Sequence, residues 1–261
     1  MPLAAGAVAW EGTHLDLAWQ ATGVGFLGGL AGGLIAGAIG LVTVPLIAVL
    51  LGLPIHVAAA TNLFQTLFTA ATGAASHAKH GHTDLRLGAT ILAGAALGAP
   101  FGSWLSLRVS PDTLRMVFVV VLLAMAARLM LRIADVEPPK TQAQPGTAAT
   151  VALGGAIGLV SGFLGIGGGF LFTPLIAMVL RVPTRVALGT GLLVIAGNSL
   201  LALGPHALAG NIWIAGGLCM AVGGSIGAKV GTRMSHWLPE RGLWALFVVV
   251  LLAVAWRMAM G

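Results

Sequence analysis

Apolar runs of roughly 20 residues fill almost the whole chain, and about 20 residues of helix are needed to cross the ~30 Å hydrocarbon core of a bilayer. Only 8% of the residues are charged, whereas an ordinary soluble domain has about 25%. The alternating pattern of a membrane β-barrel is absent, so helices are left to satisfy backbone hydrogen bonds in lipid. The sequence predicts an all-α polytopic membrane protein with apolar segments at 22–51, 57–78, 87–107, 113–133, 149–180, 186–206, 211–232 and 242–260.

The net charge of +6 comes from 13 Lys and Arg residues that are scattered at the ends of the apolar segments. Such charges typically orient membrane segments, whereas nucleic-acid binding needs a basic stripe. We therefore expect a lipid bilayer and no nucleic acid as a partner. Cys219 is the only cysteine, so no intramolecular disulfide forms. Residues 1–10 have no basic cluster and no clear cleavage site, so no signal peptide is expected.

The chain repeats itself at one fixed offset. PLIA at 45–48 aligns with PLIA at 174–177, and FVVVLLA at 118–124 aligns with FVVVLLA at 247–253. From Gly29 to Arg128, 33 of 100 positions are identical to their equivalents without a gap, against roughly a tenth expected from so biased a composition. The sequence therefore predicts two homologous halves.

The repeat divides the chain into four parts: an N-terminal segment at 1–21, a first membrane repeat at 22–134, a polar linker at 135–148 and a second membrane repeat at 149–261. The linker contains three prolines and fits an exposed connection. Each half has one apolar segment of about 30 residues followed by three of ordinary spanning length.

Charge distinguishes two topologies. If all eight segments cross the membrane, the halves are parallel and the cations split 7 to 6 between the two sides, without an orientation signal. If each long segment forms a re-entrant or broken helical hairpin with two arms of about 13 residues, the halves are inverted. Ten of the 13 cations then lie on one side, with the N-terminus outside. We favour six full spans plus two hairpins in inverted repeats, with eight full spans in parallel repeats as the alternative.

The stretch GFLGIGGGFLFTP at 162–174 concentrates glycine inside a long apolar segment. Glycine disfavours a helix interior by roughly 1 kcal/mol relative to alanine, so the helix is expected to break here. Irregular backbone is tolerated at membrane depth only where it is buried or lines a water-filled cavity, and a half-helix starting there points its positive end at an anion. Thr173 offers a hydroxyl and Pro174 suits a first helical turn; Thr43 and Pro45 are placed comparably in the first half.

Close helix packing is the alternative role for glycines. It is the favoured role for two sets with strict four-residue spacing, which are Gly94, Gly98, Gly102 and Gly223, Gly227, Gly231. Four glycines within a stretch of five exceed what one packing face needs, so at Gly165, Gly167, Gly168 and Gly169 we favour the broken helix.

The doubled order of elements resembles the TauE/SafE sulfite-exporter family, also called the toluene-sulfonate uptake permease family. These elements are a GxGGG motif, a proline some five positions later, a G-x-P or V-P turn and an A-x-G-T opening to the next helix. The resemblance covers residues 20–260 and implies a multi-pass transporter of the cell inner (plasma) membrane. It also implies a small sulfur-containing anion, such as sulfite or an organosulfonate, as substrate.

Carried over by position, the resemblance marks Gly165, Gly167, Gly168, Gly169, Pro174, Pro183, Gly189 and Thr190 in the second half, and Gly37, Gly40, Pro45, Pro54 and Thr61 in the first. The first half departs from the motif, because Ala38 and Ile39 stand where the second half has Gly167 and Gly168. Whether the two hairpins form equivalent sites is therefore left open.

Polar side chains inside membrane spans are expensive and mark candidate sites. Two spans carry them, at Thr61, Asn62, Gln65, Thr66 and Thr69, and at Thr190, Asn198 and Ser199. Four-residue spacing places Thr61, Gln65 and Thr69 on one helical face. We expect the substrate to be approached by neutral hydrogen-bond donors from Thr61, Asn62, Gln65, Thr190 and Asn198. Hydrogen bonding between helices is an alternative of about equal weight.

Histidines and arginines near the segment ends are candidates for gating or proton movement. His77 and His206 occupy matching positions, and Arg181 and Arg185 flank the second hairpin. An interfacial place for both histidines, and positive-inside topology for both arginines, are the plainer explanations. HAKHGH at 77–82 suggests a metal, but it lies in a charged loop without cysteine, so no metal is expected.

All seven carboxylates lie at segment ends or in loops, so no buried acid is left to relay protons or bind sodium. We expect an exporter of a small sulfur-containing anion that works by alternating access, with a midplane site at the hairpin tips, no cofactor and no enzymatic activity. The alternatives are an anion channel and an intramembrane histidine-dependent enzyme. The sequence leaves both a monomer and a homo-oligomer open.

Overall fold

The computed structural model describes residues 14–34, 39–132, 146–174 and 182–235, together with single positions at 176, 179, 180, 248, 249, 252, 253, 255 and 256. Within these residues the chain is helical and no strand is found. The helices are α1 (His14–Leu34), α2 (Ile39–Leu50), α3 (Ile55–Lys79), α4 (Leu85–Ser106), α5 (Pro111–Arg132), α6 (Thr147–Leu164), α7 (Gly169–Pro174), α8 (Thr184–Leu208) and α9 (Ile214–Ser235).

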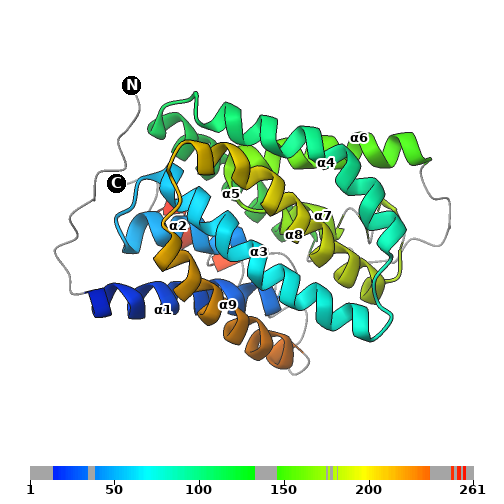
Figure 1. The fold of residues 1–261 in the computed structure, drawn as a ribbon, viewed down its shortest axis with the longest axis horizontal. Coiled ribbons are helices and arrows are strands. Elements are labelled where there is room, and N and C mark those ends of the chain that lie inside the picture. Colours follow the sequence, from blue (N-terminus) through cyan, green and yellow to red (C-terminus); the bar gives the residue numbers. More distant parts are fainter. Residues whose placement is uncertain are drawn as a thin grey trace.

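The principal helix contacts join the two halves of the sequence. Helix α1 packs along α9, α4 packs along α6, and α3 packs along α8. Figure 1 shows α1 with α9 at the lower edge and α4 with α6 at the upper edge, with α3 and α8 between them. Each outer pair therefore combines one helix from each half around a shared central pair.

Helix positions recur at the offset of the sequence repeat. Helices α3 and α8 begin and end at residues that are equivalent under the repeat, and so do α4 and α9. The contacts recur as well, because the α1 and α9 pair corresponds to the α6 and α4 pair under the same offset. The same pattern of residues thus produces the same helices and the same packing twice.

The glycines with four-residue spacing form the outer helix pairs. A side-chain carbon on Gly94, Gly98 or Gly102 would collide with backbone oxygens of α6. Carbons on Gly223, Gly227 and Gly231 would collide with backbone oxygens of α1 in the same way. Small residues let two backbones approach this closely, so the packing role favoured for both sets is confirmed.

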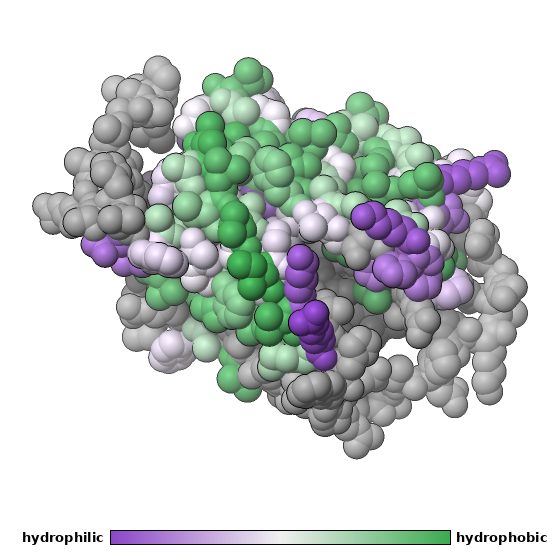
Figure 2. Space-filling model, turned by 60° about the horizontal axis from the view of Figure 1, so that its bottom comes forward, coloured by the Kyte–Doolittle hydropathy of each residue, from purple (hydrophilic) through white to green (hydrophobic). Residues whose placement is uncertain are grey.

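Among the described residues, four segments are long and apolar enough to cross a membrane: Leu85–Ser106, Thr147–Leu164, Val186–Leu208 and Ile214–Gly231. The surface agrees, since Leu97 is 81% exposed in the middle of α4 and Val222 is 59% exposed in α9. Figure 2 shows an extensive apolar face on which hydrophilic residues gather in a few groups. Such a surface suits lipid, and the protein is a multi-pass membrane protein.

Helices occupy five of the six expected spans, as α3, α4, α5, α8 and α9; the sixth, at 242–260, lies mostly outside the described residues. Within the first long segment α1 contributes residues 22–34 and α2 residues 39–50, close to the expected arms of about 13 residues. In the second long segment α6 ends at Leu164 and α7 begins at Gly169. Several positions after Pro174 lie outside the described residues, so the length of that arm stays a prediction.

Candidate functional site

The glycine cluster of the second half breaks the helix. Helix α6 ends at Leu164, and Gly165, Gly167 and Gly168 have φ values of 67°, 72° and 82°. These values lie in the left-handed region, which glycine adopts without the steric penalty of a side chain. Helix α7 begins directly at Gly169. The helix break predicted from the glycine content is confirmed.

Proline does not start the helix that follows the break. The amides of Leu171 and Phe172 both donate to Gly168 O, at 3.0 and 2.9 Å, so the first turn forms on glycine. Pro174 is the last residue of α7, and Pro45 lies inside α2. The prediction that Pro174 and Pro45 belong to a first helical turn was wrong.

Two buried asparagines hold the carbonyls of the break. Asn62 of α3 donates from Nδ2 to Gly165 O at 2.7 Å. Asn198 of α8 donates from Nδ2 to Gly167 O at 3.2 Å and to Ser161 Oγ at 2.9 Å. Buried carbonyls that leave a helix need such partners, so α3 and α8 fix the shape of the loop.

These contacts place the break near mid-depth of the bundle. The middle of α3 is Leu67 and the middle of α8 is Ala196, so Asn62 and Asn198 both lie close to the centres of their helices. At a rise of roughly 1.5 Å per residue, the distances from these centres are about 8 Å for Asn62 and about 3 Å for Asn198. The irregular backbone is therefore held near the middle of the two central helices.

The break is closely packed. A side-chain carbon on Gly167 would come within 2.8 Å of Ser199 Oγ and 2.9 Å of Thr66 Cγ2. On Gly168 it would come within 3.0 Å of Ser161 Cβ. The first half reaches the same place, because a carbon on Gly40 would collide with the backbone of Ile166. Glycine is thus required here by space as well as by φ.

Several buried polar atoms of the central helices α3 and α8 have no hydrogen-bond partner within the described part of the chain. They are Gln65 Nε2 and Oε1, Thr69 Oγ1, Asn198 Oδ1 and Ser199 Oγ, and all four side chains are at most 5% exposed. The amides of Gly167, Gly168 and Gly169 likewise donate to no backbone carbonyl among these residues. An unpaired buried polar group costs about 1–3 kcal/mol, so this cluster suits a polar ligand better than a dry core.

We call these four side chains and three amides the core polar cluster. Gln65 and Thr69 face α9, since a side-chain carbon on Gly224 would lie 2.8 Å from Gln65 Nε2 and 3.1 Å from Thr69 Oγ1. Ser199 borders Gly167, and Asn198 contacts it through Nδ2. The cluster therefore extends along the two central helices, with Asn198 and Ser199 at the break and Gln65 and Thr69 facing α9.

Thr61 and Thr190 lie away from the break and hold loops. Thr190 Oγ1 accepts from the Asp84 amide at 2.9 Å, and Thr61 Oγ1 accepts from the Trp213 amide at 3.3 Å. The two bonds are equivalent under the repeat. Each threonine thus joins the start of one central helix to the loop that follows the other. A direct contact of Thr61 or Thr190 with substrate stays a prediction.

The threonines within the two short helices, Thr43 and Thr173, contact helical residues. Thr43 Oγ1 donates to Ile39 O at 2.8 Å within α2. Thr173 lies against α8, where a side-chain carbon on Gly191 would come within 2.9 Å of Thr173 Oγ1. Gly37 falls outside the described residues, which resume at Ile39 with α2.

His206 is completely buried, and neither ring nitrogen has a partner in the described structure. His77 is half-buried near the end of α3, with its ring 6.3 Å from that of His82. No group of three or more potential metal ligands occurs among the described residues. Arg181 and the side chain of Arg185 lie outside that part of the chain.

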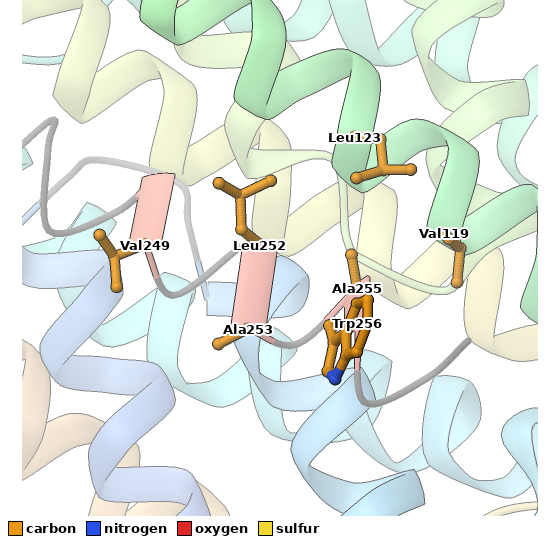
Figure 3. A pocket seen from close by; sticks show the side chains of 7 residues that line it. All are labelled: Val119, Leu123, Val249, Leu252, Ala253, Ala255 and Trp256. Carbon is orange, nitrogen blue, oxygen red and sulfur yellow. The ribbon is translucent and has the colours of Figure 1, made fainter. Parts of the chain in front are cut away.

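An apolar cavity of about 560 Å³ lies elsewhere, between α5 and residues 249–256. Figure 3 shows its lining, which is Val119, Leu123, Val249, Leu252, Ala253, Ala255 and Trp256. Apart from the Trp256 indole this lining has no hydrogen-bonding side chain, and Trp256 is 69% exposed. It offers an anion no hydrogen-bond donor besides that indole, so the break remains the candidate site.

Sequence reasoning did not select Ser161 or Ser199 as site residues. Ser161 accepts from Asn198 at 2.9 Å, and Ser199 borders Gly167. The signal available in the sequence was positional, since Ser161 precedes the glycine cluster by one helical turn and Ser199 adjoins Asn198. Neither pattern reveals which face of the helix meets the break.

Fold and site together define a polytopic helical membrane protein with a discontinuous helix in its core, which is an architecture typical of secondary transporters. The family model described as Sulfite exporter TauE/SafE matches residues 21–258. The chain therefore belongs to the sulfite exporter TauE/SafE family of membrane transporters.

Relatives of similar length agree with this membership. A "Probable membrane transporter protein" of Xylella fastidiosa (strain 9a5c) is 31% identical over 90% of this chain and 94% of its own length. The "Probable membrane transporter protein YdhB" of Bacillus subtilis (strain 168) is also 31% identical, over 82% of this chain and 88% of its own. No solved structure matches the chain.

Proposed function

We propose that this protein is a carrier, and not an enzyme, that exports a small sulfur-containing anion such as sulfite or an organosulfonate. The substrate occupies the core polar cluster at the broken helix. The observation that carries the proposal is the set of buried hydroxyl, amide and backbone N–H groups in α3, α8 and the break that lack partners in the described structure. Membership in the sulfite exporter family supports a sulfur oxyanion as the ligand of those donors.

The chemistry of the cluster suits an anion. Thr69 Oγ1, Ser199 Oγ and Gln65 Nε2 are hydrogen-bond donors, and backbone N–H groups at a break bind oxyanions in many proteins. Asn62 and Asn198 donate to the loop carbonyls, whose negative dipole ends would otherwise repel an anion. Polar backbone at membrane depth is tolerated where it lines a substrate site.

We further propose that the two halves are inverted repeats, which is the arrangement that alternating access uses. Two contacts support it: Thr190, near the start of α8, meets Asp84 after the end of α3, and Thr61, near the start of α3, meets Trp213 after the end of α8. The start of each helix thus lies beside the end of the other, so α3 and α8 run in opposite directions. Parallel repeats would run α3 and α8 in the same direction.

The inner membrane is the proposed location, with the N-terminus outside, as the distribution of Lys and Arg favours. A cell-negative potential then assists anion export by ~2.3 kcal/mol per charge per 100 mV, so a passive carrier suffices. For proton movement, His206 is the proposed candidate because both ring nitrogens are buried without a partner in the described structure. Arg181, Arg185 and His77 are proposed for gating at the membrane faces.

Sulfite efflux from proteoliposomes tests the function. Purified protein reconstituted with trapped sulfite should release it at a rate that saturates with concentration, because a carrier changes conformation in each cycle. Ser199→Ala should lower the rate several-fold, since it removes a donor of the cluster and little volume. Thr72→Val is the matched control, because Thr72 is exposed on α3 and bonds only to its own helix at Phe68 O.

A rate that rises linearly with concentration would indicate a channel and contradict the carrier. Efflux that is equal with and without protein, for sulfite and organosulfonates alike, would exclude the proposed substrate class.

A further inference from the structure

The core polar cluster has hydrogen-bond donors but no charged side chain close by along the central helices. In α3 the Lys or Arg nearest to Gln65 is Lys79, 14 positions away, and in α8 the one nearest to Asn198 is Arg185, 13 positions away. At roughly 1.5 Å per residue these are separations of about 20 Å along the helices. Helices α1, α2, α6 and α7 contain no Lys or Arg at all.

Helices α9 and α4 have the cations that come nearer among the described helices around the cluster. Lys229 and Arg233 lie 5 and 9 positions beyond Gly224, and Arg86 lies 6 positions before Leu92, which packs against Gly197. All three side chains are exposed. Asp84 is also exposed, beyond the end of α3. Formal charge of either sign is therefore kept at the ends and outer faces of these helices.

Neutral hydrogen-bond donors compensate the desolvation of a singly charged anion far better than that of a doubly charged one. The desolvation free energy of an ion rises with the square of its charge, so a dianion loses about four times as much as a monoanion of the same size. Hydroxyls, amides and backbone N–H groups supply only partial charges. A doubly charged oxyanion is therefore disfavoured here, because no Arg or Lys lies close enough to compensate its second charge.

The cluster also contains an acceptor with a fixed orientation. Because Asn198 Nδ2 faces Gly167 O and Ser161 Oγ, the other amide atom, Oδ1, is identified as the acceptor. Asn198 Oδ1 is buried and has no donor within the described residues. A ligand with bare oxygens alone leaves it unpaired, whereas a ligand with its own O–H group satisfies it.

From the absence of nearby cations in the described helices and the orphaned Asn198 oxygen, we propose that the site selects singly charged anions that carry their own hydroxyl donor. This inference rests on the proposed function and narrows its substrate. Hydrogen sulfite meets both conditions, while sulfite in its doubly charged form and sulfate meet neither. The anionic oxygens face the donors of the cluster, and the hydroxyl donates to Asn198 Oδ1.

Three anions test the effect of ligand charge and the effect of a ligand hydroxyl separately. All three are applied to the wild-type protein, so the result does not depend on the folding of a variant. Hydroxymethanesulfonate and ethanesulfonate have the same charge and nearly the same shape, but only the first has a hydroxyl donor. Sulfate is the doubly charged probe. Binding is measured by isothermal titration in detergent, and competition with hydrogen sulfite efflux is measured in proteoliposomes.

Hydroxymethanesulfonate should bind about tenfold more tightly than ethanesulfonate, which corresponds to one hydrogen bond to a buried acceptor. Sulfate should neither bind nor compete. Equal affinities for the two sulfonates, or binding of sulfate as tight as that of either, would overturn the inference while leaving transport of a sulfur anion intact. If no probe bound and no sulfur anion moved, the proposed function itself would fail, and this inference with it.

Discussion

At the scale of single residues, the broken helix depends on two asparagines and three glycines. Asn62 and Asn198 reach from α3 and α8 to two different carbonyls of the same loop. Gly165, Gly167 and Gly168 adopt left-handed φ values there. The side chains supply the partners that the helix no longer offers, and the glycines supply the conformations.

Asn62→Ala should lower the free energy of unfolding by about 1–3 kcal/mol, because Gly165 O would be buried without its donor. Denaturant unfolding in mild detergent measures this difference. Thr72→Val serves as control on the same helix and should change little. Equal stability of the two variants would show that the loop does not rely on Asn62.

Gly167→Ala should destabilise the protein by about 2 kcal/mol or more, since alanine is strained at a φ of 72° and its carbon would lie within about 3 Å of Ser199 and Thr66. Gly155→Ala is the matched control in α6, where the added carbon would meet only an ordinary contact with Gly94. The free energy of unfolding of the control should equal that of the wild type or be slightly higher, because alanine favours a helix more than glycine does. A smaller loss at Gly167 than at Gly155 would contradict the steric requirement for glycine.

At the scale of helices, close backbone contact joins the two halves. Gly98→Leu should separate α4 from α6 and either prevent folding or lower the melting temperature by several degrees, because its side chain would collide with the backbone at Gly155. Ala96→Leu introduces the same side chain on the exposed face of α4 and should be tolerated. Size-exclusion profiles and melting temperatures in detergent compare the two. Tolerance of leucine at both positions would exclude glycine-mediated packing.

The matching helices of the two halves and the break in the second half were predictable from the sequence. The internal repeat predicted matching helices, and Gly165 to Gly169 predicted the break, since both depend on local composition. The side chain that holds the break was not predictable, because Asn62, which donates to Gly165 O, lies 103 positions away in the sequence. The roles of Thr61 and Thr190 were hidden for the same reason, since their backbone partners lie in the other half.

At the scale of the whole molecule, inverted halves make a direct topological prediction. Lys79 and Leu208 are equivalent under the repeat, and both are exposed at the ends of the central helices. Single cysteines at these positions, in a Cys219→Ser background, should react with a membrane-impermeant maleimide from opposite sides of the membrane. Labelling of both from the same side would establish parallel repeats and contradict the inverted arrangement.

The central claim is that the core polar cluster exists for a ligand and not for stability, and Thr69→Val tests it most directly. Valine keeps the shape of Thr69 and removes a buried hydroxyl without a partner in the described structure, so the ligand-free protein should be as stable as the wild type or more so. Sulfite efflux should nevertheless fall several-fold, while Thr72→Val leaves both quantities unchanged. Full efflux by Thr69→Val, or a loss of stability that accounts for its lost efflux, would contradict the claim.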